Sequence, residues 1–267
     1  MDWTLGLSAF IGPGRDHRFW FRVAKELGLG AVELRAEPLF CHPAYLDRSA
    51  RREISKEARD LSLSLHASIH GPNLASLNPR LAAASTEDLL ETAELAAELG
   101  ARVVVFHPGT LPGEYIGVPG ALDRARDALR RALERAVPRA EELGVVLALE
   151  NKQKSKGRDL VLTPQEHVEL LVEFPGLKAC LDFGHLHTLG LDPRGFVTAL
   201  GDKLVHVHLH DNHGEGDEHL PLGQGTLDWK EALGALREAG YRGTVILEIP
   251  DLEGLVGSVE AVRRWAA

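Results

Sequence analysis

Short apolar runs alternate along this chain with longer stretches of helical period, and this alternation limits the possible folds more than any other feature. We expect eight strands, at Leu5–Ser8, Ala31–Leu34, Leu61–His66, Arg102–His107, Val145–Glu150, Leu177–Asp182, Leu204–Leu209 and Thr244–Ile249. Because the runs are short and apolar on both faces, they suit a parallel sheet that is buried on both sides.

The segments between these runs carry the signals of helices. Apolar residues recur at spacings of three and four in Glu87–Leu99, and Ala121–Leu143 is a longer segment of the same kind. Thr163, followed by Pro164, and Asp228 are predicted to cap the starts of two later helices. Four glycines stand where a left-handed residue would end a helix: Gly28, Gly100, Gly144 and Gly240.

Eight strand–helix units without a break in composition predict an α/β fold of one kind, a single (β/α)8 TIM barrel spanning residues 1–267 as one domain. A doubly wound open sheet is the alternative. The chain has 267 residues, 44% of them hydrophobic, which is enough for one large core.

Composition limits where in the cell the protein is expected and what it is expected to bind. No apolar run approaches the roughly 18 residues of a membrane span, and the start of the chain lacks the basic region of a signal peptide, so we expect a cytoplasmic protein. The two cysteines, Cys41 and Cys180, lack the spacing of a disulfide framework or a thiolate metal site. A net charge of −9 makes nucleic acid an unexpected partner.

Metal-binding side chains stand at the ends of six consecutive predicted strands. They are His66, His107, Glu150, Asp182, His208 and Glu248. In a barrel these positions meet at the C-terminal mouth. Carboxylates brought so close together repel one another unless a cation neutralises them, so the pattern predicts a divalent metal site.

Three further residues follow in the loops above the mouth: His185, Asp217 and His219. They could complete a second or third metal site, or be solvated loop residues. Histidine and carboxylate ligands without thiolate suit Zn²⁺ or Mn²⁺, and also magnesium, cobalt or iron. We therefore expect one to three divalent ions.

Several motifs at these positions resemble the xylose-isomerase-like TIM barrel superfamily, which includes sugar phosphate isomerases and epimerases and endonuclease IV-like proteins. The matching stretches are His66-Ala67-Ser68, Asn73-Leu74-Ala75-Ser76, Phe106-His107-Pro108-Gly109, Leu149-Glu150-Asn151, Leu181-Asp182-Phe183-Gly184-His185, His208-Leu209-His210-Asp211, Asp217 to Gly225 and Ile246-Leu247-Glu248. They cover residues 66 to 248.

The resemblance implies two overlapping ligand sets. The endonuclease IV pattern implies three metals held by all nine residues named above. The epimerase pattern implies one metal held by Glu150, Asp182, His208 and Glu248. The chain carries both sets, so the ligands alone leave the reaction open.

Two functions follow from this site. The leading hypothesis is a metal-dependent isomerase or epimerase of a sugar or sugar phosphate, in which Glu150 and Glu248 are the catalytic acid and base that exchange a proton beside metal-chelated oxygens. The alternative is an endonuclease IV-like multi-zinc hydrolase of phosphoesters. The acidic charge and the lack of a basic loop after the second strand favour the carbohydrate enzyme; a binding protein without turnover and a lyase are further alternatives.

A basic run directly after Glu150 bears on the substrate. Lys152, Lys154 and Lys156, followed by Arg158, are either a solvated loop or a clamp for a substrate anion. His70 could also contact the substrate, or replace His66 as the ligand from the third strand. The expected partner is thus a small carbohydrate or sugar phosphate.

Overall fold

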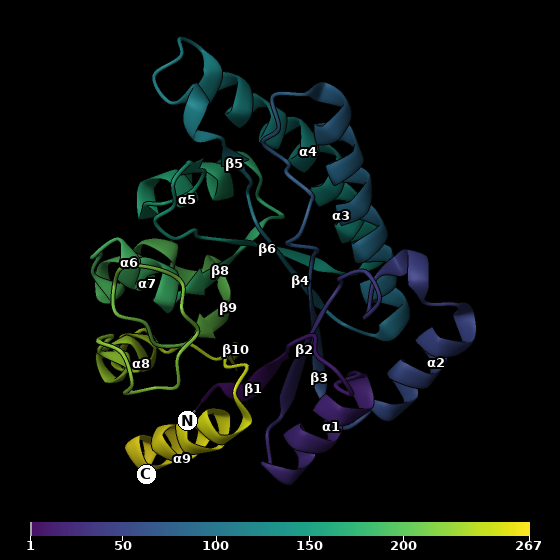
Figure 1. The fold of residues 1–267 in the computed structure, drawn as a ribbon, viewed down its shortest axis with the longest axis vertical. Coiled ribbons are helices and arrows are strands. Elements are labelled where there is room, and N and C mark those ends of the chain that lie inside the picture. The colour runs from purple at the N-terminus through teal and green to yellow at the C-terminus, as the bar shows by residue number, and fades with distance from the viewer. Residues whose placement is uncertain (1) are drawn as a thin grey trace.

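A computed structural model describes residues 2–267 as a closed parallel barrel surrounded by helices (Figure 1). The barrel strands are β1 (Thr4–Ala9), β2 (Ala31–Arg35), β3 (Ser62–His66), β4 (Val103–Phe106), β6 (Val146–Glu150), β8 (Lys178–Asp182), β9 (Leu204–Leu209) and β10 (Thr244–Leu247). Neighbours in the barrel follow chain order, and β10 pairs with β1 to close it. The predicted (β/α)8 barrel is confirmed, and the open-sheet alternative is wrong.

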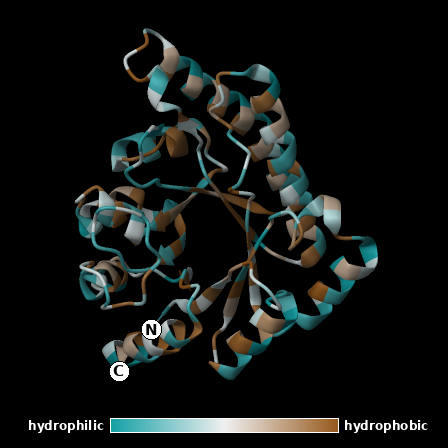
Figure 2. Cartoon of the chain, viewed as in Figure 1, coloured by the Kyte–Doolittle hydropathy of each residue, from teal (hydrophilic) through white to brown (hydrophobic). Residues whose placement is uncertain are grey.

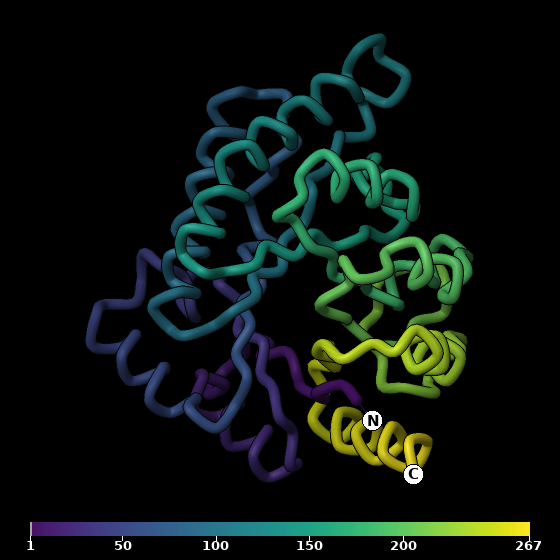
Figure 3. Tube along the Cα trace, turned by 180° about the vertical axis from the view of Figure 1, so that it is seen from behind, coloured from purple at the N-terminus to yellow at the C-terminus, as the bar shows by residue number. Residues whose placement is uncertain are grey.

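Helices follow the strands and form the outer layer of the barrel, as the views from both ends show (Figures 1 and 3). They are α1 (His17–Glu26), α2 (Arg48–Glu57), α3 (Pro79–Leu99), α4 (Ala121–Leu143), α5 (Pro164–Glu173), α6 (Phe183–Thr188), α7 (Pro193–Leu200), α8 (Trp229–Glu238) and α9 (Leu252–Ala266). Short 3-10 turns occur at Pro43–Tyr45, Gly113–Tyr115 and Gly201–Lys203. No helix within residues 2–267 has the length and apolar character needed to cross a membrane.

The helix signals in the sequence are largely confirmed. Thr163 forms a capping box with Glu166, and Asp228 caps α8. Gly100 and Gly144 end α3 and α4 with φ of 80° and 70°. The segment predicted from Glu87 is wrong at its start, because α3 begins eight residues earlier, where the Asn78 side chain caps it.

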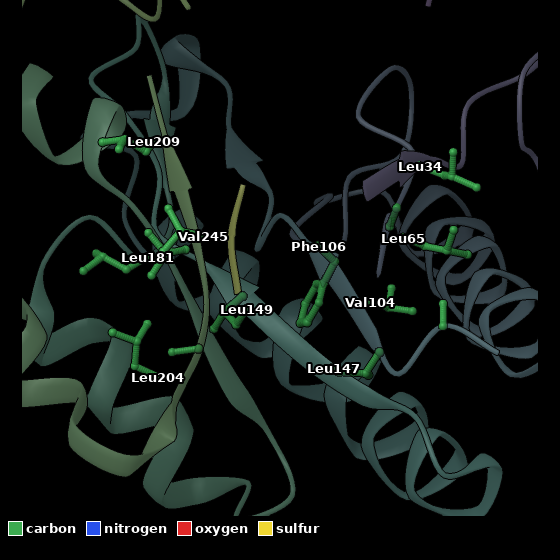
Figure 4. Packing of buried hydrophobic residues seen from close by; sticks show 14 of the residues in the cluster. Leu34, Leu65, Val104, Phe106, Leu147, Leu149, Leu181, Leu204, Leu209 and Val245 are labelled. Carbon is green, nitrogen blue, oxygen red and sulfur yellow. The ribbon is translucent and has the colours of Figure 1, made fainter. Parts of the chain in front are cut away.

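The two faces of each barrel strand pack differently. Outward side chains such as Val104, Phe106 and Leu147 join the apolar layer between the strands and the helices (Figure 4). A small separate cluster of Val105, Ala148 and Cys180 lies on the inward side. The strands form the hydrophobic centre of the hydropathy view (Figure 2). Each strand therefore delivers its last inward side chain to the mouth.

A register shift between β8 and β9 aligns two mouth residues. Ala179 pairs with Leu204, but the next residue, Cys180, pairs with His206. The extra residue on β9 therefore brings His208 level with Asp182.

A second sheet lies beyond the strands of the barrel. The two short strands β5 (Thr110–Leu111) and β7 (Arg158–Asp159) pair antiparallel. They tie the loop after β4 to the loop after β6.

Candidate metal centre at the barrel mouth

Glu150, the last residue of β6, lies at the centre of the mouth and is buried. Its Oε2 atom is 3.1 Å from Nε2 of His66 and 3.0 Å from Nε2 of His107. Its Oε1 atom is 3.2 Å from Nδ1 of His185 and 3.4 Å from Nδ1 of His208. The two carboxylate oxygens of Glu150 thus face opposite sides of the mouth, one toward β3 and β4 and the other toward β8 and β9.

Asp182, His208 and Glu248 converge beside Glu150. Ligand atoms of these three residues all lie within 4.8 Å of one another. Nδ1 of His208 is 3.9 Å from Oδ2 of Asp182 and 3.8 Å from Oε2 of Glu248. The separations are compatible with ligands that surround one ion at about 2.1 Å each.

Asp217 gathers three histidines on the outer part of the mouth. Its Oδ2 atom is 3.2 Å from Nε2 of His185 and 3.4 Å from Nε2 of His219, and its Oδ1 atom is 3.2 Å from Nε2 of His210. All nine residues predicted as metal ligands therefore lie in one connected cluster. Their binding of metal stays a prediction.

The loop that carries Asp217 and His219 is folded back onto the barrel by Asp211. Asp211 forms a backbone bridge with Leu220, and its carboxylate accepts hydrogen bonds from the amides of Asn212, Gly223 and Leu227. These contacts satisfy buried polar groups of an irregular segment. The loop is thereby fixed over the ends of β9 and β10.

Two residues beside the ligands fix their backbone. The Asn151 amide donates to the Asp182 carbonyl at 3.0 Å and accepts from the Asp182 amide at 2.8 Å, which joins the ends of β6 and β8. At Gly184 a Cβ atom would collide with the ring of His210. The sequence Asp182-Phe183-Gly184-His185 therefore needs its glycine for the approach of His210.

The carboxylates of the mouth remain ionised although they are buried. Burial raises the pKa of Asp182, but protonated His185 and His210 outweigh it and bring that pKa to about 2. Burial acts in the same way on Glu150 and Glu248, and the charge of His208 contributes to keeping both pKa values below their usual range. Nearby positive charge thus keeps these buried carboxylates ionised.

The pKa values of the histidines beside β8 and β9 shift in the opposite direction, upward. Burial lowers the pKa of His210, but Asp182 and Asp217 raise it to about 8. Burial also lowers the pKa of His185, but Asp182 and Asp217 together raise it well above its usual value. These side chains attract a positive charge, which a divalent cation would supply in place of protons.

His107 differs from them. Burial and the ammonium group of Lys152 lower its pKa to about 3. Nζ of Lys152 lies 3.3 Å from Nδ1 and 3.2 Å from Nε2 of the His107 ring, and Lys152 is 7% exposed. The ammonium group of Lys152 therefore already supplies a positive charge on the His107 side of the mouth.

Buried atoms without a hydrogen-bond partner support a fit between the cluster and a metal. Within residues 2–267 these include Oδ2 of Asp182, and also Oδ1 of Asp217 and Nε2 of His210, which face each other at 3.2 Å without forming a hydrogen bond. Leaving a buried polar atom without a hydrogen bond costs free energy, and a coordinated ion would satisfy these atoms. Histidine nitrogens and carboxylate oxygens are the donor set that Zn²⁺ and Mn²⁺ accept.

The structure separates the predicted substrate-binding residues. Lys152 lines the mouth, whereas the side chains of Lys154 and Lys156 are exposed. Arg158 pairs with Glu166 at 2.5 Å. His70 is also exposed, so His66 is the histidine from β3 that joins the cluster.

A cavity of about 500 Å³ opens beside His107 and Lys152. Its wall includes Asn73, Thr110 and Asp159, which come from the loops after β3, β4 and β6. Among the described residues that line it, Lys152 is the only lysine or arginine. The volume is in the range of small-molecule sites.

Sequence reasoning missed several buried groups of the site. Arg35 at the end of β2 donates to Oε1 of Glu248 at 2.9 Å and lies over the ring of Phe10. Glu33 lies deeper on the same strand, beside His206. The sequence does contain a signal for these two residues. Glu33 and Arg35 are two positions apart on a buried strand, so their side chains point to the same face of it.

Fold and site together define a class, a (β/α)8 barrel with a histidine and carboxylate cluster at its C-terminal mouth. The family model of xylose isomerase-like TIM barrels matches residues 21–266. The chain belongs to this family.

Individual relatives agree with this assignment. The uncharacterized protein MJ1311 of Methanocaldococcus jannaschii is 32% identical over 215 residues, which are 79% of this chain and 72% of the relative. The crystal structure of a D-tagatose 3-epimerase-like protein is 28% identical with a TM-score of 0.86, covering 98% of this chain and 97% of that one. The TTHB071 protein of Thermus thermophilus, in a crystal soaked with ZnCl2, is 27% identical with a TM-score of 0.74, covering 100% of this chain and 98% of that one.

Proposed function

We propose that the protein is a divalent-metal-dependent epimerase or isomerase of a sugar or sugar phosphate. The observation that carries this proposal is the pair of buried carboxylates, Glu150 and Glu248, beside the same nitrogen, Nδ1 of His208. Likeness to a D-tagatose 3-epimerase-like protein across nearly the whole chain supports it.

The metal would be held by Glu150, Asp182, His208 and Glu248. When bound, a divalent ion chelates neighbouring substrate oxygens and makes the carbon-bound hydrogen between them more acidic. Asp182 and His208 would serve only to hold it. Glu150 and Glu248 have a second task, which is to move the proton.

The proton transfer follows from the placement of these two carboxylates at the ends of strands β6 and β10. One carboxylate removes the proton from carbon on one face of the substrate. The residue on the other face takes up a proton from solvent and delivers it to the same carbon or its neighbour, and the first residue then releases its proton to solvent. Arg35 holds Glu248 in its ionised form through the 2.9 Å contact, which suits Glu248 to act as the base. The net reaction breaks and re-forms one C–H bond.

The substrate would enter the cavity beside His107, with Lys152 as the recognition group. We infer that Lys152 contacts an anionic or carbonyl oxygen of the substrate, since it is the cation that both lines the cavity and reaches the cluster. A charge-assisted contact of this kind contributes about 1.5–3 kcal/mol. Lys154 and Lys156 would add only long-range attraction.

The test is a turnover assay with protein that has been loaded with Mn²⁺ or Zn²⁺. D-tagatose, D-fructose and their phosphates are incubated with it in D2O, and products and deuterium incorporation are followed by NMR. We expect a new epimer or isomer that carries deuterium at the reacting carbon. Absence of both turnover and exchange across ketoses, aldoses and their phosphates would reject the proposal.

A phosphoester hydrolase is the second candidate. The cluster of Asp182, His185 and His210 and that of His210, His219 and Glu248 favour it, because they would allow more than one ion. Metal content per folded chain distinguishes the two, since one ion fits the epimerase and three fit the hydrolase. We expect no efficient nicking of an abasic-site duplex at low salt, and efficient metal-dependent cleavage would reverse the order of the candidates.

A further inference from the structure

A carboxylate lies inside the barrel below the mouth and has no role in the mechanism above. Glu33, the third residue of β2, is fully buried. Its Oε2 atom accepts a hydrogen bond from Oγ of Ser64 at 3.0 Å and lies 2.9 Å from Nε2 of His206. Its Oε1 atom lies 3.0 Å from Nε2 of His208.

The charged contacts of Glu33 are made with two histidines, His206 and His208. Within residues 2–267 its ion-pair partners are these two histidines, with no lysine or arginine among them. Neither imidazole contact is a hydrogen bond, so both are ion-pair contacts. Burying a carboxylate in this way costs free energy, and we therefore expect Glu33 to have a specific role.

His208 connects Glu33 to the mouth. Its Nε2 atom faces Glu33, while its Nδ1 atom faces Glu150 at 3.4 Å and Glu248 at 3.8 Å. A neutral imidazole carries its proton on one nitrogen and offers the lone pair of the other. Carboxylates lie at both nitrogens, so an ion at the mouth would decide between them: if it takes the Nδ1 lone pair, the proton stays at Nε2, where the Glu33 carboxylate stabilises it.

We propose that Glu33 is a positioning residue that fixes the ring orientation and tautomer of His208, so that Nδ1 serves as a metal ligand. This inference rests on the proposed function, because it assumes that an ion binds at the mouth. His206 and Ser64 hold the second carboxylate oxygen of Glu33, so the carboxylate cannot rotate freely. The arrangement makes the inner layer of the barrel part of the metal site.

The alternative occupant of this layer is a separate ion. Ligand atoms of Glu33, His206 and His208 also lie within 4.8 Å of one another. Such an ion would need the Nε2 lone pair of His208, and His208 would then bridge two ions as an imidazolate. The positioning role needs only a neutral ring, and we therefore favour it.

The test measures metal affinity without any turnover. Metal-free wild type and Glu33→Gln are titrated with Mn²⁺ and Zn²⁺ by calorimetry or chelator competition, and circular dichroism and thermal unfolding check the fold. We expect Glu33→Gln to bind the same number of ions roughly 10–100-fold more weakly. Glu37→Gln is the matched control, because Glu37 is also buried on this segment but accepts from the backbone amide of Ile69, and its affinity should be unchanged.

A second readout follows the tautomer itself. In zinc-loaded protein with 15N-labelled histidine, NMR should show His208 protonated at Nε2 in wild type and a loss of that single form in Glu33→Gln. If Glu33→Gln does not fold, Ser64→Ala replaces it, with a few-fold loss of affinity expected because the carboxylate loses one anchor.

The outcomes separate the two proposals. If wild type binds no metal, the proposed function fails. If wild type binds metal and neither Glu33→Gln nor Ser64→Ala weakens it, only the positioning role is wrong. Loss of one whole equivalent of metal at unchanged residual affinity would instead make Glu33 a ligand of its own ion and overturn the inference.

Discussion

The two sides of the barrel mouth carry similar side chains in opposite electrostatic settings. On the side of β3 and β4, Lys152 and burial bring the pKa of His107 to about 3. On the side of β8 and β9, Asp182 contributes to raising the pKa of His210 to about 8. The same residue type is thus kept neutral on one side and drawn toward a positive charge on the other.

This difference suggests a division of labour. A divalent ion would be stabilised where carboxylates are in excess, near Asp182, His208 and Glu248. The proposed substrate would bind in the cavity that the ammonium group of Lys152 lines. Glu150 belongs to both sides, because its two oxygens face different histidines.

The largest effect is expected from the two carboxylates proposed to move the proton. Glu150→Gln and Glu248→Gln should each lower kcat by roughly 10²–10⁴-fold, since an amide cannot accept a proton. Turnover or deuterium exchange of the identified substrate measures it, with Glu37→Gln as the buried-carboxylate control. Activity within a factor of about two of wild type would remove these residues from the mechanism.

The next prediction compares the two sides directly by metal affinity. Asp182→Asn should weaken binding of the tightest ion by at least roughly 100-fold, the upper range for residues that only support a ligand. His107→Gln should change that affinity only slightly, because Lys152 disfavours a second cation there. Titration of metal-free protein is the measurement. Equal losses in both variants would break the division between the sides.

Metal removal should also lower stability. An ion present at 100 times its dissociation constant stabilises the fold by about 2.7 kcal/mol, which corresponds to a shift of roughly 5 °C in Tm for a chain of this size. Calorimetry before and after dialysis against a chelator checks this. The shift should return on adding Mn²⁺ or Zn²⁺ and should be much smaller in Asp182→Asn.

The smallest effects concern substrate recognition. Lys152→Gln should lower kcat/KM by about tenfold through KM, with metal content unchanged. The exposed pair Lys154→Ser with Lys156→Ser is the matched comparison and should change kcat/KM by less than about twofold at low ionic strength. A larger effect from the exposed pair would restore the clamp of three lysines that the sequence predicts.

The fold and most of the candidate site could be predicted because both depend on local pattern. The strand signals were correct within one or two residues, and every strand that ends in a ligand faces the same mouth. His66, Glu150 and Glu248 could be named for that reason.

Other residues depend on geometry that a local pattern does not contain. Glu33 lies in the layer below the mouth, so its role depends on which residues of β9 face it across the barrel interior. Arg35 contacts Glu248 only because closure of the barrel leaves a single strand, β1, between β2 and β10. The burial of Lys152 and the exposure of Lys154 follow from the path of a loop.

The pairing of β10 with β1 has a consequence for the order of events during synthesis. Domains emerge from the ribosome with the N-terminal end first. Glu248 follows the last strand of the barrel, which pairs with the first only when nearly the whole chain is available. A nascent chain can therefore offer histidines to passing metal ions well before the carboxylate that completes the set. The final strand would then act as the step that commits the ion to its site.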